Sequence, residues 1–290
     1  MEVKMQEYIL KNPNSFNLEH IFECGQCFRW NKQEDGSYTG IFKENVLNVK
    51  QKGKDFVFKG ICQGDIKEVI QEYFDLNRNY DEIKNTLKKI DENMVVSIKA
   101  GDGIRLLNQE LWETIVSFII SANNNIPRIK GIIERLSAKY GKEITFEGRS
   151  YYTFPTPSEL SKVTVEEFRK LGLGFRDIRL YETVHMVLYG KVNLEEMELE
   201  KNTSFIKQEL LKLSGVGPKV ADCILLFSTL KRLEVFPIDV WVRRVMNELY
   251  IKNEDENKVK PKLIEKIAIE KFGNLAGMAQ QYLYYWKREA

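Results

Sequence analysis

Two side chains in this chain of 290 residues have the type and spacing for nucleophilic chemistry, Lys219 and Asp239. Lys219 follows the glycine-containing turn at residues 213–218 and stands at the start of an apolar segment that predicts a helix. The helix dipole disfavours a cation at that end, whereas a nucleophilic amine is useful only when it is neutral. We therefore expect Lys219 to act as an uncharged amine nucleophile.

Asp239 lies twenty positions downstream, between Pro237 and the apolar segment 240–246. This place predicts the N-cap of a further helix, where a carboxylate accepts a hydrogen bond from a free backbone N–H group. A capping carboxylate is held rigidly. Asp239 is therefore expected both to cap the helix and to face a positive charge that develops near the amine.

The elements that must position Lys219 are the two helices on either side of the turn, which make a helical hairpin over about 203–230. We expect Gly215 and Gly217 to turn the chain at positive φ and to leave backbone N–H groups unshielded. Pro218 suits the first turn of the second helix. Free amides and a positive dipole end form an anion site that suits a DNA phosphate, although the glycines alone would favour a plain helical hairpin.

Composition and charge are those of a soluble globular protein, with 43% apolar and 30% charged residues. A net charge of only +2 excludes a strongly basic shell, so any contact with nucleic acid must be local. The sequence has no apolar run of membrane-spanning length and no signal peptide. We expect a monomer in the cytoplasm, associated with the nucleoid in a bacterium, or a nuclear protein in a eukaryote.

The cysteines do not predict a redox or metal site. Cys24 and Cys27 have the Cys-x-x-Cys spacing of a thioredoxin-type site, but short strands follow them where such a site needs a helix. Cys62 and Cys223 are isolated, so neither a zinc site nor an iron–sulfur cluster is expected. With only two histidines in the chain, we expect no bound metal in the chemistry.

The predicted fold class is α+β, with a small antiparallel β domain at residues 1–97 and a helical domain at 98–290. Short strands are expected near 28–30, 38–42, 46–49 and 56–58, separated by turn residues. Periodic apolar residues predict helices at 65–74, 80–90, 110–120, 202–213, 218–230, 239–250, 263–272 and 275–286, and Thr164 to Glu167 fits a capping box.

Taken together, the motifs resemble the helix-hairpin-helix DNA glycosylases and, among them, the 8-oxoguanine DNA glycosylase/AP lyase family. The hairpin and the aspartate indicate the superfamily, and the lysine indicates members with lyase activity. The resemblance extends over nearly the whole chain and includes Cys24-Gly25-Gln26-Cys27-Phe28-Arg29-Trp30, Ser121-Ala122-Asn123-Asn124-Asn125, Leu171-Gly172-Leu173-Gly174-Phe175-Arg176 and Ala276-Gly277-Met278-Ala279-Gln280.

The resemblance implies excision of 8-oxoguanine from duplex DNA, after the damaged nucleotide is flipped into a pocket. Lys219 would attack the sugar and form a Schiff base, Asp239 would stabilise the oxocarbenium-like charge, and β-elimination would then nick the strand. No cofactor is implied. The hairpin carbonyls of Leu211, Leu213 and Val216 are nevertheless candidates for holding a monovalent cation beside a phosphate.

The resemblance also implies a set of base-binding residues. The carbonyl of Gly25 would accept from the N–H group that distinguishes the oxidised base from guanine, and Gln280 would pair with the amide edge of the base. Cys223 would stack on one face, unless it is simply a buried thiol. Tyr284 is expected to cover the other face, with Tyr285 and Trp286 as alternatives from the same helix.

Four further residues are implied in holding the opened duplex. Asn123 would fill the space that the flipped nucleotide leaves, and Phe175 would wedge between base pairs. Arg128 and Arg176 would hydrogen-bond the orphaned base. The alternatives are a helix-cap asparagine, a packed phenylalanine and solvated arginines.

One position departs from the family pattern, and other functions stay open. Trp241 stands where animal members carry a histidine, which indicates a bacterial branch with a looser preference for cytosine opposite the lesion.

One alternative function is a glycosylase for alkylated bases, which uses water and needs no lysine. Others are a non-catalytic DNA-binding module, in which Lys219 simply meets a phosphate, and a redox protein built on Cys24 and Cys27.

Overall fold

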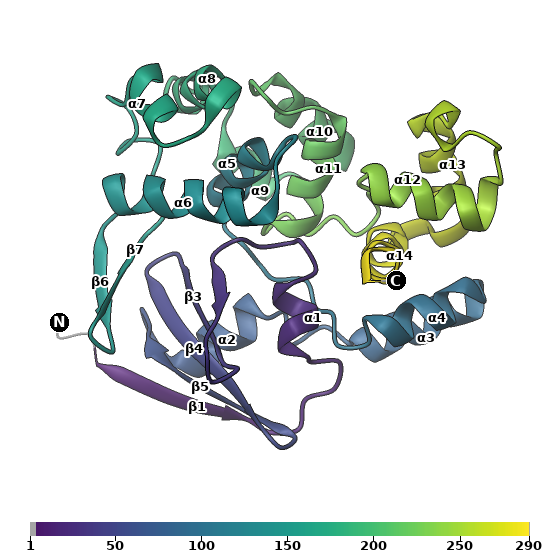
Figure 1. The fold of residues 1–290 in the computed structure, drawn as a ribbon, viewed down its shortest axis with the longest axis horizontal. Coiled ribbons are helices and arrows are strands. Elements are labelled where there is room, and N and C mark those ends of the chain that lie inside the picture. The colour runs from purple at the N-terminus through teal and green to yellow at the C-terminus, as the bar shows by residue number, and fades with distance from the viewer. Residues whose placement is uncertain (1–3, 290) are drawn as a thin grey trace.

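A five-stranded antiparallel sheet forms the N-terminal part of the computed structural model, which describes residues 4–289 (Figure 1). The strand order is β1-β5-β4-β3-β2, which leaves β1 and β2 at the edges. The strands are β1 (Met5–Leu10), β2 (Trp30–Lys32), β3 (Tyr38–Phe42), β4 (Asn45–Lys52) and β5 (Asp55–Ile61). The strands expected near 38–42, 46–49 and 56–58 are confirmed as β3, β4 and β5, whereas the edge strand β1 was not anticipated.

Aromatic side chains fill the core beside this sheet. The ring of Trp30 stacks on Phe22 with 4.2 Å between the ring centroids. The indole N–H group of Trp30 donates a hydrogen bond to the Tyr73 hydroxyl at 3.0 Å. A side chain at Gly40 would place its Cβ 2.2 Å from the Trp30 ring. Glycine is therefore required at that point of β3 so that the indole can lie flat on the strand.

The helices α1 to α4 lie before residue 101, and they divide between two cores. Helices α1 (Leu18–Phe22) and α2 (Ile66–Tyr73) pack in the core beside the sheet, whereas α3 (Tyr80–Ile90) and α4 (Asn93–Ala100) contribute to the core of the helical body. Helix α4 packs against the C-terminal helix, as Figure 1 shows. The chain therefore crosses between the cores before residue 97, and the boundary at 97/98 stays a prediction.

The helical body is built around α5, in which every residue from Leu111 to Ile120 is buried. Helix α11 packs directly on it. The helices of this body are α5 (Leu111–Ser121), α6 (Ile126–Tyr140), α7 (Val165–Lys170), α8 (Asp177–Leu188), α9 (Leu194–Leu199), α10 (Thr203–Lys212), α11 (Pro218–Phe227), α12 (Val240–Met246), α13 (Pro261–Phe272) and α14 (Ala276–Glu289). The predicted α+β class is confirmed, and so is the capping box, because Thr164 and Glu167 cap α7 reciprocally.

Three local features differ from the expectations. Helix α11 ends at Phe227 rather than at 230, because the Ser228 hydroxyl donates to the Ile224 carbonyl and accepts from the Leu230 N–H group. Helix α12 passes into a π-turn at Asn247–Ile251. A hairpin of β6 (Glu143–Phe146) and β7 (Arg149–Tyr152) interrupts the helical region, and its Phe146 packs on Ile41 and Val46 of the sheet.

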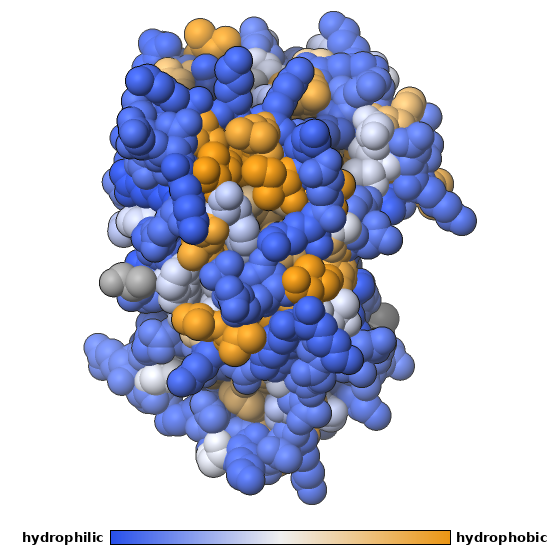
Figure 2. All heavy atoms as spheres, turned by 90° about the vertical axis from the view of Figure 1, so that its right-hand side faces the viewer, coloured by the Kyte–Doolittle hydropathy of each residue, from blue (hydrophilic) through white to orange (hydrophobic). Residues whose placement is uncertain are grey.

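The surface is largely hydrophilic. Figure 2 shows the side that carries α12, α13 and α14, where apolar side chains gather only in separate patches. Exposed apolar residues on these helices include Val240, Leu263 and Ile269. Within residues 4–289, no helix is long and apolar enough to cross a membrane.

Candidate active site

The turn between α10 and α11 places Lys219 at the second position of α11. Gly215 adopts φ +87°, as expected, but Gly217 has φ −93° and ψ 178°, so the expectation of a positive φ at Gly217 is wrong. Gly217 is instead the N-cap of α11, and no side chain caps this helix. A Cβ at Gly217 would meet no atom within 4 Å, so glycine leaves the first turn of α11 open to approach from outside.

Lys219 and Asp239 line the same small cavity, of about 50 Å³. The cavity lies where α11, α14, the start of α12 and the segment after α1 meet. Its remaining walls are formed by Cys24, Gly25, Phe118, Cys223, Phe227, Pro237, Gln280, Gln281 and Tyr284. The amine also lies over the ring of Phe118, 5.5 Å from the centroid. The two residues expected to carry the chemistry are therefore brought together by the fold.

The charge state of the amine differs from the expectation. Burial lowers the pKa of Lys219, but the neighbouring Cys223 and Asp239 favour the ammonium, so the net pKa is raised. Cys223 contributes little of this as a charge at neutral pH, because burial raises the pKa of its own thiol to about 11. The raised pKa favours the ammonium form of Lys219, which must lose a proton before it can attack.

Asp239 is the N-cap of α12, as predicted. Its carboxylate accepts from the Val242 N–H group at 2.8 Å. Burial raises the pKa of Asp239 above its usual value, while the Val242 N–H group and the Lys219 ammonium oppose this rise. The cap fixes one oxygen of the carboxylate and leaves the group facing the amine across the cavity.

The residues expected to bind the base also meet at this cavity. Gly25 has φ +81°, which a residue with a side chain rarely adopts. Gln280 is buried and its Oε1 atom has no hydrogen-bond partner among the described residues. A buried amide oxygen without a partner is costly, so it is suited to accept from a ligand. Cys223 is a buried wall of the cavity.

Tyr284 is the wall of the cavity that lies against Gly25. Its hydroxyl would lie 3.2 Å from a Cβ on Gly25, so the ring lies directly against this glycine. A space of about 50 Å³ holds only a water or two. A purine therefore does not fit unless walls of the cavity move, and the Tyr284 ring is the wall that lies against Gly25. Of the three aromatic residues considered on α14, Tyr284 lines the cavity, whereas Tyr285 packs against His20 with 5.3 Å between the ring centroids.

The residues expected to hold the opened duplex are not among the cavity walls: Asn123 follows α5, Arg128 lies in the first turn of α6, and Phe175 and Arg176 follow α7. Asn123 is exposed and adopts φ +52°, a strained conformation for a residue other than glycine. Phe175 is 53% exposed. An apolar ring that is exposed beside a strained polar turn is suited to insert into a partner.

Arg176 fixes these two residues to each other. It is 1% exposed, and its guanidinium donates to the carbonyls of Ala122, Leu173 and Asn123, the last at 2.8 Å. It also lies over the Phe175 ring, 4.2 Å from the centroid. A direct bond from Arg176 to an orphaned base stays a prediction, and it would require exchange of these bonds.

The side chains of Arg128 and Trp241 are both exposed to solvent. Arg128 is exposed and donates to the Gly172 carbonyl at 3.3 Å. Trp241 is 37% exposed and lies under Arg244, 5.3 Å from the ring centroid. The Trp241 position therefore presents an aromatic ring next to a cation beside the cap of α12.

Sequence reasoning missed several walls of the cavity, among them Phe118, Phe227 and Gln281. Phe118 and Phe227 read as core residues of apolar helices, and nothing in their spacing marks them as ligand-facing. Gln281 follows Gln280, and this second glutamine beside the first was the only signal in the sequence.

Among the described residues, no group of three or more His, Cys, Asp or Glu side chains lies together as a metal site would need. The Leu213 carbonyl accepts from the Val216 N–H group at 3.1 Å, and the monovalent cation expected at these carbonyls stays a prediction.

Comparison with known proteins places this geometry in a family. Residues 8–115 match the family described as "8-oxoguanine DNA glycosylase, N-terminal domain", and residues 116–270 match the "HhH-GPD superfamily base excision DNA repair protein" family. The "N-glycosylase/DNA lyase OGG1" of Arabidopsis thaliana is 30% identical, with 92% of this chain and 76% of that protein covered. The "N-glycosylase/DNA lyase" of Saccharomyces cerevisiae is 29% identical, with 94% and 84% covered.

A solved structure of an 8-oxoguanine glycosylase/lyase is also similar to this chain. The 8-oxoguanine glycosylase/lyase of Clostridium acetobutylicum, in complex with double-stranded DNA containing cytosine opposite 8-oxoG, superimposes with a TM-score of 0.92. It is 44% identical, and the match covers 100% of this chain and 99% of that one.

Proposed function

Because the chain belongs to the 8-oxoguanine DNA glycosylase family of the HhH-GPD superfamily, we propose that it excises 8-oxoguanine from duplex DNA and then cleaves the strand at the resulting abasic site. The observation that carries the proposal is that Lys219 and Asp239 face each other across one cavity, which Gly25 and Gln280 also line. An amine, a carboxylate and two groups that can bind a purine edge are thereby gathered at one place.

In the proposed reaction, the Lys219 amine attacks C1′ of the flipped nucleotide and the glycosidic bond breaks. The base leaves with the bonding electron pair and takes up a proton, for which the ammonium of Lys219 is a source. Asp239 stabilises the positive charge that builds up on the sugar, because its carboxylate is held in place by the cap of α12. The sugar ring opens to a Schiff base on Lys219, and loss of a C2′ proton expels the 3′ phosphate.

Base recognition is proposed to use two polar groups of the cavity. The Gly25 carbonyl accepts from the N–H group that 8-oxoguanine has and guanine lacks, and it repels the lone pair that guanine presents instead. Gln280 supplies its unpartnered Oε1 and its N–H groups to the amide edge of the base. Cys223 stacks on one face of the base, and Tyr284 swings aside and then covers the other face.

Outside the cavity, the proposed roles are to hold the duplex open. Asn123 fills the vacated space and Phe175 wedges between base pairs, while Arg128 contacts the orphaned base. The open first turn of α11, with Gly215 and Gly217 before it, receives a phosphate.

Product analysis separates this proposal from the alternatives. The protein is incubated with duplexes that carry 8-oxoguanine, 3-methyladenine or no lesion, and free base and strand cleavage are measured separately. The proposal predicts release of 8-oxoguanine together with strand cleavage. Release of 3-methyladenine without cleavage would instead identify a monofunctional glycosylase for alkylated bases, and binding without release of any base would identify a non-catalytic DNA-binding protein.

A further inference from the structure

Three backbone carbonyls next to Gly25 accept hydrogen bonds from side chains that lie outside residues 23–26. The Glu23 carbonyl accepts from Arg288, the Cys24 carbonyl from Gln281 at 2.7 Å, and the Gln26 carbonyl from Gln109 at 2.7 Å. Among the described residues, no donor reaches the carbonyl of Gly25. Gly25, whose carbonyl is the one without a donor in residues 23–26, is also a residue that lines the cavity.

Gln109 connects this segment to the helix that carries Lys219. Its amide group donates a second bond, of 3.0 Å, to the carbonyl of Phe227, which is the last residue of α11. Gln109 itself is buried and is not among the cavity walls. One side chain therefore sets the position of the Gly25 segment relative to α11 without touching the space where a base would lie.

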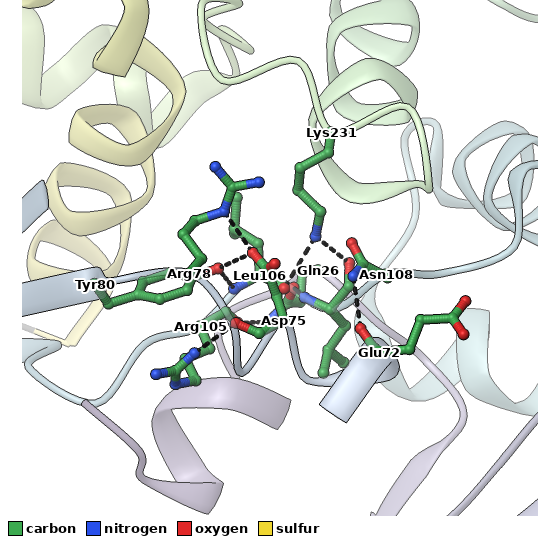
Figure 3. Close-up of polar contacts among 10 residues, drawn as sticks. Gln26, Glu72, Asp75, Arg78, Tyr80, Arg105, Leu106, Asn108 and Lys231 are labelled. Carbon is green, nitrogen blue, oxygen red and sulfur yellow. Dashed lines mark hydrogen bonds and ion pairs between the residues drawn. The ribbon is translucent and has the colours of Figure 1, made fainter. Parts of the chain in front are cut away.

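The side chain of Gln26 fixes the same segment from its other side. It is fully buried, donates to the Ile21 and Arg105 carbonyls at 2.8 and 2.7 Å, and accepts from the Leu107 N–H group at 2.8 Å. Figure 3 shows Gln26 next to Leu106 and below Lys231, at the junction between the sheet and the helical body. The segment is therefore held between the irregular stretch at residues 101–109, which follows α4, and the helical body.

We propose that Gln109 and Gln281 are positioning residues for lesion recognition, which hold the Gly25 carbonyl at a fixed angle in the cavity. The inference rests on the proposed function. Discrimination between an N–H group and a lone pair depends on a dipole that cannot turn away from the wrong base. The hydrogen bonds to the Cys24 and Gln26 carbonyls fix the peptide planes on both sides of the Gly25 carbonyl to α14 and to the end of α11, and so restrict its movement.

The test compares two substrates that differ only in whether there is a base to recognise. Excision of 8-oxoguanine needs both the Gly25 carbonyl and Lys219, whereas cleavage of a preformed abasic site needs Lys219 alone. Gln109→Met keeps the size of the side chain but removes its donors. We expect single-turnover excision to fall roughly tenfold or more, while abasic-site cleavage stays within about twofold of the unmodified protein.

Gln281→Met removes the hydrogen bond from α14 to the Cys24 carbonyl, and the same two activities are measured. This variant is used in place of Gln109→Met if Gln109→Met does not fold. Gln109→Met is the sharper variant, since Gln281 also lines the cavity. The matched control is Lys231→Met, which removes two hydrogen bonds at the same junction, to the carbonyls of Leu106 and Leu107, without touching residues 23–26. We expect both activities of the control to be unchanged.

Two outcomes would overturn the inference. In one, folded Gln109→Met and Gln281→Met excise 8-oxoguanine at the rate of the unmodified protein. In the other, excision and abasic-site cleavage fall by the same factor in both variants, which is the result of a merely structural role. Failure of the proposed function would look different, because the unmodified protein would then be inactive on both substrates.

Discussion

Lys231 is a partly buried lysine at the junction between the sheet and the helical body. Its ammonium donates to the Leu106 and Leu107 carbonyls at 3.0 and 2.7 Å (Figure 3), and no carboxylate forms an ion pair with it among the described residues. Burial lowers the pKa of Lys231 to about 7, with Asp75 opposing and Arg78 adding to the effect. The unfolded chain would hold this lysine near its ordinary pKa of about 10.4.

The sign of the pH dependence follows from these two pKa values. Below pH 7 the lysine is protonated in both states, so it adds no slope. Between about pH 7 and pH 10 the unfolded state holds more protons than the folded state, so the free energy of unfolding rises with pH. The limiting slope for one group is about 1.4 kcal/mol per pH unit. Because part of this side chain reaches solvent, we expect about 1–2 kcal/mol in total between pH 7 and pH 9.

Urea denaturation of the unmodified protein and of Lys231→Met at pH 7, 8 and 9 measures this contribution. The difference in unfolding free energy, unmodified protein minus variant, should become more positive as the pH rises. Titration of all other groups cancels in this difference. Parallel stability curves for the two proteins would refute the reasoning, since they would show that Lys231 keeps the same pKa in both states.

Three further predictions concern the active site. Asp239→Asn keeps a good N-cap and should change the unfolding free energy by less than about 1 kcal/mol, yet it should slow 8-oxoguanine excision by roughly a hundredfold or more, as measured in single turnover. Because the pKa of Lys219 is raised, the reactive amine becomes more abundant as the pH increases, so the rate of Schiff-base formation on abasic-site DNA should rise between pH 6 and pH 9; a flat profile with chemistry rate-limiting would contradict this. Asn123→Gly relieves a positive φ and should raise the unfolding free energy by up to about 1 kcal/mol while weakening binding to lesion-containing duplex, and tighter binding would argue against a role in filling the opened helix.

Local sequence patterns were sufficient for most of the fold. The period of apolar residues located α3 at Tyr80–Ile90, and turn residues between β-branched and aromatic stretches located β3 to β5. Strand β1 could not be found in this way, because its partner β5 comes from a distant part of the chain and the pairing leaves no local signal. The hairpin of β6 and β7 is likewise stabilised by Phe146 packing on the sheet, which is a tertiary contact.

Part of the candidate site could likewise be predicted from the sequence, and part of it depends on contacts that only the fold creates. Lys219 and Asp239 could be predicted because a glycine turn and a helix start mark them in the sequence. The charge state of Lys219 could not, since it depends on how close Asp239 and Cys223 come to the amine in space. Gln109 was also invisible, because it acts through two backbone carbonyls that only the folded chain brings together.

The proposed reaction depends on a covalent bond between Lys219 and the sugar, and borohydride trapping detects that bond. The protein is incubated with a duplex containing 8-oxoguanine in the presence of borohydride, and the adduct is digested and located by mass spectrometry. Lys212→Gln, on the exposed end of α10, is the matched control for Lys219→Gln. The account predicts an adduct on Lys219 that persists in Lys212→Gln and disappears in Lys219→Gln. An unmodified protein that releases the base without forming an adduct, or an adduct that survives Lys219→Gln, would contradict it.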